Sequence, residues 1–155
     1  MTRTRLPLSP TEKERLDALL DRHLDTTVHH YGTEPRSAAR YDKREEMYGG
    51  SGTTYLLQMF EDEELVNNRI GAYMVLPTRQ DSVGFHTHGD RAEQELYVGM
   101  HGRGTYLEKD HAEAAPRSVP IEAGTITTIR GRALHAVRNA GDQPLIIFVI
   151  TTFEP

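Results

Sequence analysis

From Thr53 onward the chain is a series of short β-forming runs, which glycine, proline, asparagine and aspartate separate. Short runs bounded by turn residues predict strands, and a series of them is typical of an all-β barrel or sandwich. The runs are TTYLLQMF, RIGAYMVL, VGFHTH, ELYVGMHG, GTYLE, TITTIR and LIIFVITTF. We therefore expect residues 53–155 to form one all-β domain, and 155 residues are enough for one domain with a sizeable core.

The preceding segment, residues 1–52, is expected to be an extension made of a helix and a loop. Ser9 precedes Pro10, a favoured first helical residue, and Glu12 is placed to complete a capping box with Ser9. Leucines follow at helical spacing, at positions 16, 19, 20 and 24, so we expect a helix of about four turns with one apolar stripe. Residues 25–52 are polar and contain a glycine cluster, which favours a loop with at most one short helical piece.

Several side chains of the β region have the chemistry of a metal site. His86 and His88 are two residues apart, and because strand side chains alternate between faces, both imidazoles are expected to point the same way. Glu95 and His135 would add a carboxylate and a third imidazole. Glu93 is the alternative to Glu95 as the carboxylate ligand. The chain has no cysteine, so a transition-metal site must use histidine and carboxylate.

These residues resemble the two sequence motifs of the cupin superfamily. The first motif has an H-x-H pair, a glutamate and a glycine seven residues after that glutamate, and the matching residues are His86, His88, Glu95 and Gly102. The second has a glycine, a histidine eleven residues later and an asparagine four beyond that, and the matching residues are Gly124, His135 and Asn139. The two motifs occur in the family's order, and the resemblance covers about residues 69–153.

The chain departs from the family pattern at three places. Gln80 stands where the family usually has its first glycine, and Gly84 lies nearer to the H-x-H pair. The link from His88 to Glu95 is about two residues longer than usual, although Glu95 keeps the family spacing to its glycine. The family's usual Pro-x-Gly before the last histidine is replaced by Arg130-Gly131-Arg132.

The resemblance implies a double-stranded β-helix, or jelly roll, in which the strands of the two motifs face each other across the barrel. It also implies that His86, His88, Glu95 and His135 bind one divalent transition metal ion. Fe, Mn, Ni, Co and Zn all suit such ligands, with one or two positions open for water or substrate.

Residues beside the expected metal site are candidates for catalysis and substrate binding. By strand alternation Tyr97 faces the same way as Glu95, so it is a candidate hydrogen-bond donor or acid/base, the alternative being a packed tyrosine. Glu95 itself is a candidate base. Tyr73, on the strand before the first motif, is expected to line the cavity and contact substrate. Arg130 and Arg132 are candidates to bind a substrate carboxylate or phosphate, the alternative being a solvated basic turn.

We expect a small metal-dependent enzyme that acts on a small polar metabolite, for instance one that carries a carboxylate. The resemblance allows isomerase, lyase, cyclase or dioxygenase chemistry. The alternative is a non-catalytic cupin that binds a small molecule or regulates. A net charge of −5 argues against a nucleic-acid partner. No run approaches the roughly 20 apolar residues that span a bilayer, and no secretory signal is recognised. We therefore expect no membrane partner, a cytoplasmic location and a homodimer.

Overall fold

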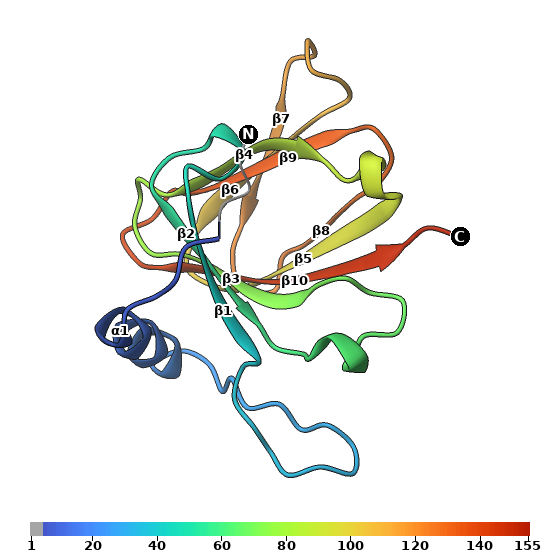
Figure 1. Ribbon diagram of the computed structural model, residues 1–155. Helices are drawn as coiled ribbons and strands as arrows, with labels where there is room; N and C mark the ends of the chain where they lie inside the picture. The colour runs from blue at the N-terminus through green and yellow to red at the C-terminus, as the bar shows by residue number, and fades with distance from the viewer. Residues whose placement is uncertain (1–4) are drawn as a thin grey trace.

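The structure is a computed structural model that describes residues 5–155, and it consists of one helix and two facing β-sheets. Figure 1 shows the sheets enclosing a barrel, with helix α1 (Pro10–Asp21) on its outside. The strands are β1 (Arg40–Glu45), β2 (Thr53–Gln58), β3 (Gly71–Leu76), β4 (Ser82–Thr87), β5 (Glu93–His101), β6 (Gly104–Lys109), β7 (Arg117–Ile121), β8 (Ile126–Ile129), β9 (Leu134–Asn139) and β10 (Leu145–Phe153). Short 3₁₀ turns are η1 (Met47–Gly49), η2 (Asp62–Glu64) and η3 (Gly89–Arg91).

The strand pairing is that of a double-stranded β-helix, and all pairs are antiparallel. One sheet has six strands in the order β1-β2-β3-β10-β5-β8, and the other has four in the order β4-β9-β6-β7. Residues of both sheets share a buried core, among them Leu56, Met74, Val137 and Ile147. The predicted all-β jelly roll with an N-terminal helix is confirmed. Within residues 5–155 no helix is long and apolar enough to cross a membrane.

Helix α1 packs on the outer face of the six-stranded sheet. Leu16 and Leu20 are buried against a second apolar cluster, which includes Val75 and Ile146 of β3 and β10. Ser9 caps the helix as predicted, since its Oγ accepts a hydrogen bond from the Glu12 amide at 3.1 Å. The side chain of Glu12 points elsewhere. It accepts hydrogen bonds from Tyr55 Oη at 2.7 Å and Lys43 Nζ at 2.8 Å, which tie the helix to β1 and β2.

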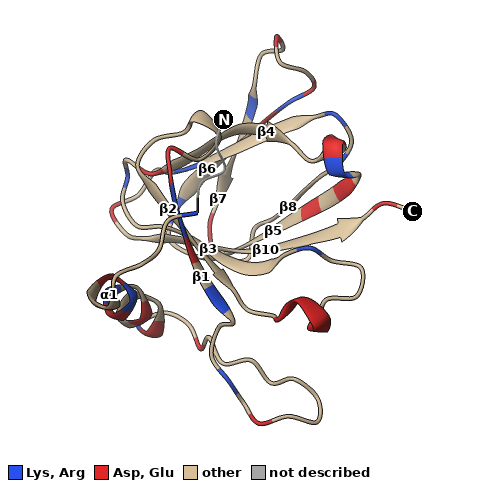
Figure 2. Cartoon of the chain, in the orientation of Figure 1, with Lys and Arg blue, Asp and Glu red and all other residues tan. Residues whose placement is uncertain are grey.

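The expectation of loop throughout residues 25–52 was wrong at β1. This strand pairs with β2 at the edge of the six-stranded sheet, and its two faces meet different surroundings. Tyr41 packs among the outer cluster, whereas Asp42 is buried and Arg44 lines a pocket on the inner side. Figure 2 shows charged residues along β1 and none along β10. An edge strand that carries charge lacks the apolar signal by which the inner strands were recognised.

Candidate metal centre

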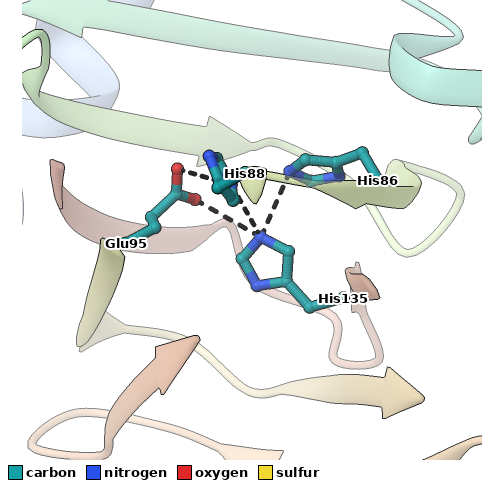
Figure 3. A group of neighbouring side chains, drawn as sticks. All are labelled: His86, His88, Glu95 and His135. Carbon is teal, nitrogen blue, oxygen red and sulfur yellow. Dashed lines mark hydrogen bonds and ion pairs between the residues drawn. The ribbon is translucent and has the colours of Figure 1, made fainter. Parts of the chain in front are cut away.

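Four buried side chains converge inside the barrel from both sheets. His86 lies on β4 and His135 on β9, and their Cα atoms are direct partners across these strands. His88 directly follows β4, and Glu95 comes from β5 in the opposite sheet. One ligand atom from each of the four lies within 4.8 Å of every other. Figure 3 shows the four side chains pointing toward one another. The predicted ligand set is therefore brought together in one place.

The distances place three Nε2 atoms and one carboxylate around a common centre. His135 Nε2 lies 3.2 Å from His86 Nε2 and 3.1 Å from His88 Nε2. Glu95 Oε2 is 2.9 Å from His88 Nε2, and Glu95 Oε1 is 3.6 Å from His135 Nε2.

The outer nitrogens of two histidines face groups that can only accept a hydrogen bond. His86 Nδ1 lies 2.8 Å from the Gly84 carbonyl oxygen, and His88 Nδ1 lies 3.5 Å from Glu93 Oε2. A proton on His86 Nδ1 satisfies the first contact and leaves its Nε2 lone pair for the centre. His88 Nδ1 faces Glu93 but makes no hydrogen bond to the described residues. The Glu95 oxygens are also acceptors. A cluster of acceptors lacks donors of its own, so this arrangement fits a divalent cation.

The third histidine contacts Tyr106 of β6, whose hydroxyl lies 3.1 Å from His135 Nδ1 and can either donate or accept a hydrogen bond there. Burial lowers the pKa of His135 well below its usual value, and the nearby positive charges of His86 and His88 lower it further. His135 is consequently neutral at neutral pH, which is the form that binds a metal.

His88 has the opposite electrostatic environment. Burial disfavours its charged form, but the hydrogen bond with Glu95 and the charges of Glu95 and Glu93 outweigh burial, so the pKa of His88 is raised. A metal that binds here must displace a proton from His88 once the pH falls below that pKa.

Glu93 is an outer partner of the site and not one of the four converging ligands. Its side chain is fully buried and is held by Arg69 through two bonds, Nε to Oε1 at 2.6 Å and Nη2 to Oε2 at 3.0 Å. The same carboxylate faces His88 Nδ1. Glu93 thus lies behind His88, whereas Glu95 is the carboxylate that converges with the three imidazoles.

Replacing Glu93 by glutamine tests this outer role. In Glu93→Gln the partner of His88 Nδ1 loses its charge, and we expect metal affinity to fall roughly 10–100-fold, as is typical for outer partners of metal-bound histidines. A competition titration with a chromophoric chelator measures the change. The matched control is Glu122→Gln, because Glu122 is exposed and does not line the site. Unchanged affinity in Glu93→Gln would show that this carboxylate does not orient His88.

A short segment that packs against β4 covers His86 from the side. The Tyr48 ring stacks on the His86 ring, with centroids 4.1 Å apart and planes 10° apart. Tyr48 has φ 54° and ψ 34°, a left-handed conformation that side chains other than glycine adopt at a cost. Gly84 permits the approach, since a Cβ there would lie 2.1 Å from the Tyr48 carbonyl oxygen. The ligand strand and this segment are therefore fitted to each other.

Three of the four converging residues, His86, His88 and Glu95, line a pocket of about 180 Å³. That volume equals about six waters at about 30 Å³ each, so it suits a small ligand.

The pocket lining includes Tyr97, which lies beside Glu95 and stacks on His135, with ring centroids 5.1 Å apart. Burial raises the pKa of Tyr97 well above its usual value, and the charge and hydrogen bond of Glu95 raise it further. Tyr97 therefore keeps its proton, packs as a core residue and faces the site as well.

The three predicted substrate-binding residues lie outside this pocket, which corrects the expectation. Tyr73 faces the other side of β3, where it contacts Phe148 and lines a different pocket beside residues 26–29. Arg132 is exposed and pairs with Asp90 at 2.8 Å, and Arg130 is exposed as well. The arginines that line the metal pocket are Arg5, Arg44, Arg69 and Arg91. Sequence reasoning also missed Tyr48 and Tyr106, for which no motif gives a signal.

Comparison with known proteins supports the fold and the site. No family model matches the chain. Glucose-6-phosphate isomerase from Pyrococcus horikoshii is 32% identical over 65 residues, which are 42% of this chain, and the protein from Pyrococcus abyssi matches equally. The matched segment spans 34% of those proteins, about a third of the length of the curated relatives.

Solved structures match over more of the chain. A predicted oxalate decarboxylase from Thermotoga maritima has a TM-score of 0.64 at 25% identity, and the match covers 74% of this chain and 92% of that one. The cupin domain of Schizosaccharomyces pombe Cnp3 has a TM-score of 0.55 at 6% identity, covering 85% and 88%. Together with the two facing sheets, these likenesses show that the chain has the double-stranded β-helix fold of cupins, and the buried group of three histidines and one glutamate is a possible metal site within it.

Proposed function

We propose that this protein is a metal-dependent isomerase that acts on a small hydroxy-carbonyl metabolite in the pocket above the four ligands. The observation that carries the proposal is the convergence of three imidazoles and one carboxylate, of which His86, His88 and Glu95 line a small cavity. The relation to the two Pyrococcus glucose-6-phosphate isomerases supports isomerisation as the reaction. A divalent ion bound at the four ligands would polarise a carbonyl or hydroxyl oxygen of the substrate.

The side chains of the pocket supply what an aldose–ketose isomerisation needs. The reaction moves a proton between adjacent carbons, and it requires no oxidant and no second substrate. Glu95 is the only carboxylate among the described residues that line the pocket, so we assign it the transfer of this proton. Burial and the charge of Glu95 raise the pKa of Tyr97 well above its usual value, so Tyr97 keeps its proton beside that carboxylate.

A second candidate is decarboxylation of a small carboxylate. The likeness to the Thermotoga maritima protein favours it, because that protein is a predicted oxalate decarboxylase. The match covers most of both chains. The same metal centre would serve either reaction, so the substrate decides between them.

The test is a metal-reconstitution assay. Stripped protein is reloaded separately with Fe, Mn, Ni, Co or Zn and incubated in deuterated water with glucose 6-phosphate, with shorter aldose phosphates and, in parallel, with oxalate. We expect product formation and deuterium incorporation next to the carbonyl with at least one metal and one sugar phosphate, and neither in His135→Ala. Release of CO₂ from oxalate without sugar isomerisation would favour the second candidate. Inactivity of every metal form on both substrate classes would reject both reactions.

A further inference from the structure

The walls of the pocket carry an excess of positive charge. Four arginines line it, whereas Glu95 is the only carboxylate among its described lining residues. Two of the arginines already have carboxylate neighbours, since Arg5 lies 3.9 Å from Asp42 and Arg69 is bound to Glu93. Arg91 adds its charge to that of a bound divalent ion. Electroneutrality therefore favours an anionic group on whatever fills the cavity.

Arg91 is held beside the metal ligands by its backbone. Its amide donates a hydrogen bond to the His88 carbonyl at 3.1 Å, within the turn η3 that links His88 to β5. The neighbouring carboxylate, Asp90, is engaged by Arg132 at 2.8 Å, and no ion pair among residues 5–155 uses the Arg91 side chain. The half-buried Arg91 therefore lines the pocket without an ion pair to a carboxylate among the described residues.

Arg69 presents further donors to the same space. Its Nε and Nη2 bind Glu93, but a guanidinium has five N–H donors, and its side chain is 34% exposed and lines the pocket. The backbone of Arg69 is fixed, because its amide donates to Thr151 Oγ1 at 3.2 Å. A rigid guanidinium with unused donors is suited to bind carboxylate or phosphate oxygens.

We infer that Arg69 and Arg91 form an anion-binding subsite, which holds the carboxylate or phosphate group of the substrate beside the metal centre. The inference deepens the proposed function. It rests on that function only for the part of the substrate that is not the anionic group. It places the anion site at residues that line the cavity and not at Arg130 and Arg132, which were the candidates from the sequence.

The subsite is tested with small anions on metal-stripped protein, which separates it from metal binding and from catalysis. Inorganic phosphate and malonate are titrated by calorimetry, one probe for each anion class. We expect wild-type protein to bind at least one of them at a single site, and Arg91→Gln to bind it about tenfold or more weakly, as expected for the loss of a charge-assisted hydrogen bond. Arg91→Lys keeps the charge and should bind with intermediate affinity.

The matched control is Arg130→Gln, which removes the same charge from an exposed position outside the pocket. We expect it to bind the probe within about twofold of wild type, because distant surface charges are screened by salt. Equal weakening in Arg91→Gln and Arg130→Gln, or no binding of either anion to the wild type, would overturn the subsite. If anion binding follows this pattern while no metal form isomerises a sugar, the proposed function fails and the subsite stands.

Discussion

His135→Ala protein is expected to lose its metal ion while keeping its fold. The variant removes one of four ligands, and the ligand it removes is the one whose Nε2 lies within 3.2 Å of both other imidazole nitrogens. We expect affinity to fall by well over the roughly 10–100-fold that losing an outer partner costs. The measurement is metal content after dialysis against a weak chelator, followed by a titration of stripped protein.

Two further variants make the result specific. His111→Ala removes an exposed histidine from the turn between β6 and β7, and it should bind metal as wild type does. Glu95→Gln keeps the size of the side chain and should weaken binding, which guards against the chance that His135→Ala unfolds. Full metal occupancy in both His135→Ala and Glu95→Gln would mean that the four residues do not bind the ion.

Gly84→Ala is the second change with a large expected effect. The added Cβ would lie 2.1 Å from the Tyr48 carbonyl oxygen and 2.8 Å from the Gly50 amide nitrogen, both of them backbone atoms that cannot rotate away. The strand or the covering segment must therefore move, and overpacking of this kind typically costs about 1–3 kcal/mol in the free energy of unfolding. Because the Gly84 carbonyl also accepts from His86 Nδ1, metal affinity should fall together with stability.

The control for this change is Gly141→Ala. A Cβ at Gly141 would meet its nearest atom at 3.4 Å, which is ordinary van der Waals contact, so stability and metal affinity should stay close to wild type. Denaturant unfolding and a metal titration of both variants give the comparison. Equal unfolding free energies and equal metal affinities for Gly84→Ala and Gly141→Ala would mean that the close packing of Tyr48 on β4 has no role in holding His86.

The ligand set could be predicted from the sequence because two simple rules apply to it. Alternation along a strand places His86 and His88 together, and the barrel brings β9 next to β4. The same rule could not choose between Glu93 and Glu95, since both face inward on β5. Their roles differ only because Arg69, from the loop before β3, reaches one of them. That contact depends on the three-dimensional path of a loop.

The error at Tyr73 has a related cause. Strand β3 is apolar on both faces, because Met74 packs in the barrel core while Tyr73 and Val75 pack beneath helix α1. A strand that is covered on both sides has no polar face, so the alternation of apolar and polar residues in its sequence does not reveal which face points into the barrel. The arginines of the pocket were missed for the opposite reason. Arg44 lies on a charged edge strand and Arg91 on a 3₁₀ turn, where charge is ordinarily explained by exposure.

The homodimer and the cytoplasmic location remain predictions. The confirmed parts are the jelly roll, its outer helix and the convergence of the four ligand side chains.

The most direct test of the metal centre is a titration of stripped wild-type protein with Co(II) and Zn(II), read by stoichiometry and by X-ray absorption at the metal edge. We predict one ion per chain, bound by three imidazole nitrogens and one carboxylate of the protein, with any remaining ligands from solvent. A chain that binds no divalent ion, or binds one without histidine nitrogens around it, would contradict the assignment of His86, His88, Glu95 and His135.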